Sequence, residues 1–224
     1  MMVMRNKMVN LRELDLTDAT IIANTYNYGT GVSEDNVFPD FMKGKRLMKL
    51  MLPTSITRIG NDALRNCDNI KSITIPATVT SIGQYAFYDC AALNSVEVPE
   101  NSQLQSVEQY AFSYTSGSCR SLKIIDFTQA QQLQTTGAYA FFRASSIESI
   151  LLPSSLQSID NYAFSACSSL TNIATNANIG NSAFGGCTAL TKVSFGEGAT
   201  SIGQYAFTGC SSLKDVSLPS TLDK

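Results

Sequence analysis

The chain has 224 residues and a formal net charge of −2, and 15% of its residues are charged, against about 25% in an average domain. Nucleic-acid binding needs a basic surface, so this balance argues against a nucleic-acid partner. The sequence contains no histidine, which removes the commonest general base and the commonest transition-metal ligand. No run of about 18 apolar residues is present, so no membrane span is predicted.

The first 46 residues are expected to form an irregular N-terminal coil of the fold. They begin with MMVMRNKMVNL, which lacks the apolar segment of a secretory signal, so no signal is visible in this chain. A first apolar-x-x-apolar-x-apolar segment lies at Leu11–Leu16, and a long irregular linker follows at Ile21–Phe41. Tyr26 and Tyr28 in this linker are candidate partner contacts. The alternative is that they only pack over the side of the fold.

Short strands are expected at regular intervals from Leu47 to the end of the chain. Eight further copies of the apolar-x-x-apolar-x-apolar pattern are rich in β-branched residues and alternate in polarity, as short strands do. Several copies end in proline, which cannot donate a hydrogen bond to a continuing ladder. The copies lie at Leu47–Pro53, Ile70–Pro76, Leu93–Pro99, Leu122–Phe127, Ile147–Pro153, Leu170–Thr175, Leu190–Phe195 and Leu213–Pro219.

A second motif alternates with these strands, and SIGQYAF is its clearest form, identical at Ser81–Phe87 and Ser201–Phe207. Its alanine recurs seven times, with spacings of 23, 25, 29, 23, 20 and 23 residues. A period of 20–29 residues with L-x-x-L-x-L strands is typical of a leucine-rich-repeat solenoid. The alanines are Ala63, Ala86, Ala111, Ala140, Ala163, Ala183 and Ala206.

Stacking of such units places like residues on like along the core, because one unit cannot bury its own apolar face. We therefore predict a single domain over 1–224, an α/β-type right-handed solenoid that is rich in β structure. About nine short parallel strands would form its concave face, with turns or helical turns on the convex side. A ladder of buried phenylalanines is expected at Phe87, Phe112, Phe141, Phe164, Phe184 and Phe207.

The repeat L-x-x-I-x-I-P-x-x-V-x-S-I-G-x-x-A-F-x-x-C-x-x-L resembles the BspA-like, or Treponema pallidum-type, leucine-rich repeats. The resemblance extends from Leu11 to Leu222, with Ser-Ile-Gly, Ala-Phe and Cys recurring in order. It implies a bacterial surface or secreted protein that functions in adhesion to host proteins or to other microbes. The sequence departs from the pattern at LQTTGAYAF, where Thr-Thr replaces Ser-Ile, and at 176–183, which is three residues short.

The six cysteines favour neither a metal site nor a disulfide framework. Zinc sites usually contain paired C-x₂₋₄-C spacings, and none is present. Thiols in a stacked ladder point the same way, which suits disulfide torsion poorly, so buried free thiols are expected. Cys119 departs from the regular pattern because it follows the insertion Ser113–Ser118. Two acidic pairs, Glu13 with Asp15 and Glu97 with Asp126, could suggest a glycosidase. Nothing completes either pair, so no enzyme activity, cofactor or metal is predicted.

Binding is instead expected on the outward strand positions, where side chains vary freely while the core positions do not. These positions are mostly small and polar, with scattered apolar residues and no dominant charge. An alternative is that most of this face is plain solvated sheet. The candidate partner-binding residues are Tyr26, Tyr28, Met51, Thr74, Glu97, Ile124, Asp126 and Leu151.

The predicted function is therefore an extracellular or cell-surface module that binds an extracellular protein or glycan. One alternative is a structural spacer within a larger surface protein, and another is a repeat region that accompanies a separate catalytic domain. Because Met8–Leu11 resembles the middle of a repeat and the chain stops just after a strand, we expect further repeats or domains to flank this segment.

Overall fold

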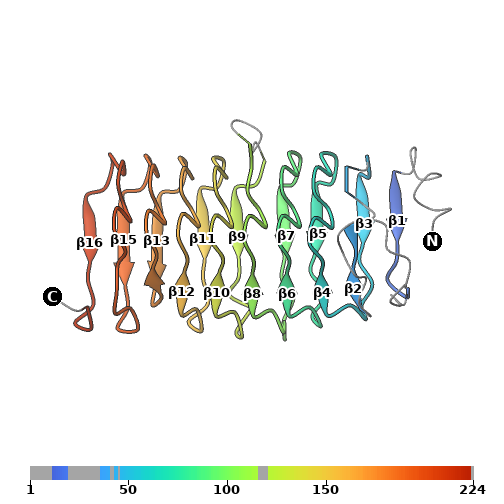
Figure 1. The fold of residues 1–224 in the computed structure, drawn as a ribbon, viewed down its shortest axis with the longest axis horizontal. Coiled ribbons are helices and arrows are strands. Elements are labelled where there is room, and N and C mark those ends of the chain that lie inside the picture. The colour runs from blue at the N-terminus through green and yellow to red at the C-terminus, as the bar shows by residue number, and fades with distance from the viewer. Residues whose placement is uncertain (1–11, 20–35, 41–42, 45, 116–120, 223–224) are drawn as a thin grey trace.

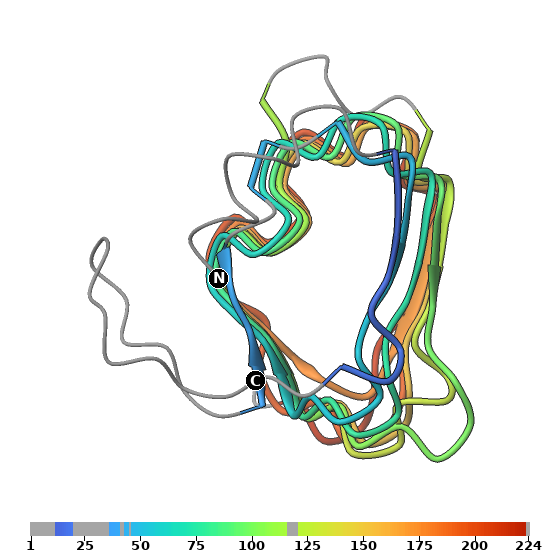
Figure 2. The same cartoon turned by 90° about the vertical axis from the view of Figure 1, so that its right-hand side faces the viewer.

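The computed structural model describes residues 12–19, 36–40, 43–44, 46–115 and 121–222. Within these ranges the chain winds as a parallel β-solenoid, and its coils follow one another along a single long axis (Figure 1). Viewed along that axis, successive coils lie nearly on top of one another (Figure 2). The described residues contain no α-helix, and the convex side is formed by turns, as at 84–89.

Nine strands of three or four residues form one wall of the solenoid, here called the front wall, at the nine positions predicted from the repeat. Each strand pairs in parallel with a neighbour one coil away, for example Ile73 with Val96. In the interior coils the central residue points inward and is buried. The strands are β1 (Glu13–Asp15), β3 (Lys49–Met51), β5 (Ser72–Thr74), β7 (Ser95–Glu97), β9 (Ile124–Asp126), β11 (Ser149–Leu151), β13 (Asn172–Thr175), β15 (Lys192–Phe195) and β16 (Asp215–Ser217).

A second sheet, here called the back wall, forms the opposite side of each coil (Figure 2). It contains seven parallel strands of only two residues, and it uses the Ser-Ile step of the repeat, where turns alone were expected. The turns themselves follow immediately, as at 84–89. The back-wall strands are β2 (Val37–Phe38), β4 (Arg58–Ile59), β6 (Ser81–Ile82), β8 (Ser106–Val107), β10 (Thr135–Thr136), β12 (Ser158–Ile159) and β14 (Asn178–Ile179).

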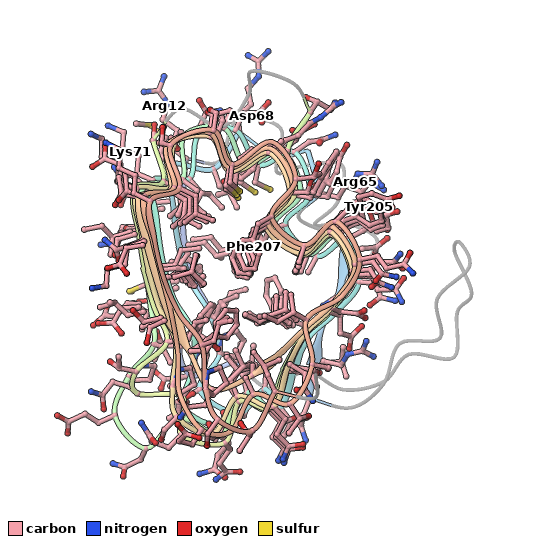
Figure 3. All side chains as sticks on the ribbon, turned by 90° about the vertical axis from the view of Figure 1, so that its left-hand side faces the viewer. Arg12, Arg65, Asp68, Lys71, Tyr205 and Phe207 are labelled. Carbon is pink, nitrogen blue, oxygen red and sulfur yellow. The ribbon has the colours of Figure 1, made fainter. Side chains whose placement is uncertain are left out.

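The predicted phenylalanine ladder fills the space between the two walls. Adjacent rings stack nearly parallel, with centroids 4.8–5.4 Å apart, and the first five rings are buried. Phe207 differs from the prediction because it is only partly buried. Its ring stacks on Phe184 and makes an edge contact with Phe195, and among the described residues no next ring of the ladder stacks on it. Figure 3 shows Phe207 inside the coil at this end of the molecule.

The glycine of Ser-Ile-Gly is required because neighbouring coils approach closely at that turn. A Cβ at Gly83 would lie 2.6 Å from Asn61 Oδ1 and 2.8 Å from the carbonyl carbon of Gly60. A Cβ at Gly203 would lie 2.5 Å from the carbonyl carbon of Gly180. Contacts below 3.0 Å do not occur for real Cβ atoms, so a side chain here would separate the coils.

The cysteines form a second ladder. Cys67, Cys90, Cys167 and Cys187 are buried as predicted, whereas Cys210 in the last of these coils is only partly buried. The Sγ atoms of Cys90, Cys167, Cys187 and Cys210 each donate to a main-chain carbonyl of the preceding coil at 3.1–3.2 Å. Burial raises the pKa of the Cys187 thiol to about 12. Cys90, Cys187 and Cys210 are free thiols, and the protonated form of Cys187 therefore predominates at neutral pH. Cys119 lies outside the described residues.

Candidate binding surface

The outer face of the front wall consists of the first and third residues of each strand. Parallel pairing in register brings these residues into two rows that run along the solenoid. The predicted residues Thr74, Glu97, Ile124, Asp126, Met51 and Leu151 all lie in these rows. Tyr26 and Tyr28, the other two predicted contacts, lie outside the described residues.

Apolar side chains interrupt this polar face at its centre. Ile124 of β9 is 56% exposed, and Leu151 of the adjacent strand β11 is 44% exposed. The register pairs Ile124 with Ser149 and Asp126 with Leu151, so the two apolar residues are diagonal neighbours. Met51 is also exposed but lies several coils away. The structure thus brings Ile124, Leu151 and Asp126 together and leaves Met51 apart.

Opposite charges on this face, or directly beside it, pair across adjacent coils. Lys123 Nζ lies 2.8 Å from Glu148 Oε1, and Lys192 Nζ lies 3.0 Å from Asp215 Oδ2. Asp126 accepts hydrogen bonds from the nitrogen and Oγ1 of Thr128 at 2.8 and 2.6 Å. Thr74 Oγ1 donates to Glu97 Oε2 at 2.9 Å. Because the charges alternate and pair, the described face has no strong field of one sign to attract a highly charged ligand.

The geometry offers no support for acid–base chemistry at Glu13 and Asp15. Hydrogen bonds from the Thr17 side chain and main chain hold the pKa of Asp15 below its usual value. A glycosidase general acid needs the opposite shift. Among the described residues, no group of three or more His, Cys, Asp or Glu side chains could hold a metal ion. None of the described segments forms a helix with the length and apolar content that a membrane crossing requires.

A stack of tyrosines on the outside of the turns was not predicted from the sequence. Tyr85, Tyr110, Tyr139 and Tyr162 come from four successive coils, and their rings stack with centroids 4.8–4.9 Å apart. The sequence contains a pattern that indicates this stack, because tyrosine directly precedes Ala-Phe in five of the seven repeats. It was missed because the residue before a buried Ala-Phe pair can point to either side of the chain until the turn conformation is known.

The fold and its outer surfaces define the class of protein: a parallel β-solenoid of the leucine-rich-repeat type, in which coils present an ordered face. The BspA type leucine rich repeat region matches residues 39–171 and 171–224 in six copies. The chain belongs to this family. Leucine-rich-repeat folds are typically non-catalytic, and the family match identifies the chain as a binding or repeat module. No curated protein matches the chain.

Solved structures that match this chain come from several bacteria. The T. pallidum leucine rich repeat protein is 27% identical with a TM-score of 0.62, and the match covers 80% of this chain and 77% of that one. A leucine-rich repeat protein from Bacteroides ovatus is 24% identical with a TM-score of 0.42, covering 94% and 62%. A leucine rich cell surface protein from Faecalibacterium prausnitzii is 15% identical with a TM-score of 0.35, covering 93% and 88%.

Proposed function

We propose that this chain is a cell-surface or secreted binding module that recognises a macromolecule of a host or of another microbe through the outer face of the front wall. The observation that carries the proposal is the exposed diagonal pair of Ile124 and Leu151 at the centre of a polar sheet. Neither side chain belongs to the buried core. Adjacent exposed apolar side chains rimmed by polar residues are typical of a contact surface.

Two further features support this proposal. The front wall is held by core residues that repeat from coil to coil, such as Ile125 and Ile150, so the outward residues vary without changing the scaffold. The paired charges of Lys123 and Glu148 lie beside Ile124 and Leu151, and they would form part of the polar rim that surrounds an apolar contact. The surface location rests on the family, whose members are typically surface or secreted proteins. An extracellular protein or a glycan would contact such a face by shape more than by charge.

The test is a binding screen of the purified chain against immobilised extracellular-matrix proteins and mucin glycans, followed by a double variant. Ile124→Asp with Leu151→Asp should weaken binding of any partner found by at least tenfold, because it places two charges at the centre of the contact. Circular dichroism and thermal melting should show that the variant stays folded, since both side chains point away from the core.

A matched control introduces the same two charges elsewhere on the same face. Ser72→Asp with Ser217→Asp removes no apolar surface, and both residues occupy exposed positions of front-wall strands. This control should bind like the unchanged chain. If the Ile124 and Leu151 variant folds and still binds with unchanged affinity, the front wall is not the contact surface, and a structural spacer within a larger surface protein becomes the better interpretation.

A further inference from the structure

At one end of the tyrosine stack lies the positively charged guanidinium group of Arg65. The guanidinium carbon of Arg65 lies 5.1 Å from the ring centroid of Tyr85 and 4.9 Å from that of Tyr88. The Tyr85, Tyr110, Tyr139 and Tyr162 rings then follow with interplanar angles of 5–11°. Figure 3 shows Arg65 and Tyr205, at the two ends of this row, outside the ribbon where the coils bend inward. Each step between two tyrosines of this row is therefore face to face.

Ser182 interrupts this order in the next coil. Its main chain follows the same path as the tyrosines, because its φ is 51° against 56–59° for the five tyrosines. Its neighbours are in register: the Tyr162 nitrogen donates to the Asn181 carbonyl, and the Ser182 nitrogen donates to the Gln204 carbonyl, both at 2.9 Å. Only the ring is missing, and Tyr205 restores it one coil further on.

The interruption leaves two ring faces without a stacking partner on that side among the described residues. Tyr162 is 37% exposed and Tyr205 is 73% exposed, and both are among the exposed large hydrophobic residues. The phenylalanines of the same three coils, Phe164, Phe184 and Phe207, are separated by steps of 5.3 and 5.4 Å. Two such steps, applied to the tyrosine row, give a separation of about 11 Å between the Tyr162 and Tyr205 ring centroids, which leaves room for one intervening aromatic ring at ordinary stacking distances.

The edges of this space also lack rings. Where Tyr88 and Phe142 lie edge-on against the stack in earlier coils, these three coils have Ser165, Gly185 and Thr208. A Cβ placed on Gly185 would meet Thr208 Cγ2 at 3.4 Å and Ser165 Oγ at 3.6 Å, so small side chains border the space beside Ser182. No charged side chain occurs at any of these positions, which favours an uncharged occupant.

We propose that the space over Ser182, between Tyr162 and Tyr205, is a binding slot for one aromatic side chain of a partner protein. The occupant would replace the missing tyrosine, with both of its faces covered at the spacing seen in the rest of the stack. A flat ring fits this slot on both faces, whereas a sugar ring is puckered and carries hydroxyl groups. The slot lies on the turns and is distinct from the front wall, so it does not depend on the function proposed above.

The test uses N-acetyl-tyrosinamide as the probe and follows its ring protons by NMR during titration with the full chain. Rings above and below the probe should shift these signals upfield, with saturation at millimolar concentration. Ser182→Tyr should fill the slot and reduce the shift at least tenfold, while raising the melting temperature. Ser182→Ala leaves the slot open and should bind like the unchanged chain. N-acetylglucosamine, as a second probe, should show no saturable shift.

A second variant tests the same slot from its other wall. Tyr205→Ala removes an exposed ring, so it should fold and lose the probe shift even if Ser182→Tyr proves unstable. The proposal is overturned if the unchanged chain produces no saturable upfield shift, or if either folded variant keeps the full shift. Saturable binding of N-acetylglucosamine in place of the aromatic probe would overturn the choice of an aromatic occupant.

Discussion

Thr136 is the one polar residue among the inward positions of the back wall. The equivalent residues are Phe38, Ile59, Ile82, Val107, Ile159 and Ile179, and all of them are buried. Thr136 is fully buried as well, and its Oγ1 finds no hydrogen-bond partner among the described residues. The hydroxyl therefore lost its contacts with water on folding and gained nothing in return.

Thr136→Val should stabilise the protein because it keeps the shape of the side chain and removes the buried hydroxyl. The expected gain in the free energy of unfolding is about 1 kcal/mol, measured by chemical denaturation. Thr175→Val is the matched control, because Thr175 is buried but its Oγ1 accepts a hydrogen bond from the Ala177 nitrogen at 3.1 Å. That change should lower stability. Equal effects of the two changes would contradict the interpretation.

A second prediction at the level of single residues concerns the position before each cysteine. Ala166 has a φ of 61°, in the left-handed region, and the equivalent residues of the next two coils are Gly186 and Gly209. Ala166→Gly should raise the free energy of unfolding by about 0.5–1 kcal/mol, because glycine adopts this conformation without strain. Gly186→Ala should lower it by a similar amount. Its new Cβ would lie 3.7 Å from Ala166 Cα, so strain alone would act.

At the scale of elements, the solenoid is stabilised by ladders more than by individual strands. A two-residue strand such as Ser81–Ile82 cannot form alone, and its neighbours at Arg58–Ile59 and Ser106–Val107 satisfy its main chain. The phenylalanine ladder runs between the walls and fixes the spacing of the coils. Removal of one ring should therefore leave a gap that the rigid coils on either side cannot close.

Phe164→Ala should lower the free energy of unfolding by about 3–5 kcal/mol, because Phe164 is fully buried between the rings of Phe141 and Phe184. Phe207→Ala should cost clearly less, because Phe207 is partly exposed and stacks face to face on one ring, Phe184, where Phe164 stacks on two. Denaturant titration of the two variants checks the difference. A Phe164 variant with unchanged stability would show that the ladder does not hold the coils together.

At the scale of the whole molecule, each coil contacts its neighbours along the axis, so stability depends on how many neighbours a coil has. In β16 all three residues are exposed, and Val216 is 46% exposed although it occupies a core position of the repeat. Its parallel partner Val193, one coil earlier, is fully buried. The described structure places no coil beyond β16.

Val193→Ala should lower the free energy of unfolding by about 2 kcal/mol, whereas Val216→Ala should lower it by less than about 1 kcal/mol. The chemical change is identical, and the two residues pair directly, so only the number of neighbouring coils differs. Thermal or denaturant unfolding measures both. Equal costs would show that a partner, such as a second copy of the chain, covers β16 in solution.

The repeated spacing alone determined the solenoid, the nine front-wall strands and the inward positions of the phenylalanines and cysteines. This was possible because every core position recurs about every 23 residues. One alignment of the repeats therefore assigns all of these positions together. The exposure of Ile124 and Leu151 also followed from alternation along a strand. By contrast, the single-domain boundary at 1–224 and a binding role for the outward residues remain predictions.

Only the tertiary structure decided three other features. The back wall could not be predicted, because two-residue strands show no alternation and form only when a neighbouring coil supplies their hydrogen bonds. The partial exposure of Phe207 depends on which coils surround it. The slot over Ser182 depends on the left-handed conformation that turns the tyrosines outward, and on register that aligns Tyr162 with Tyr205 across two coils. The placement of two residues 43 positions apart follows from the path of the chain in space, which local sequence patterns do not contain.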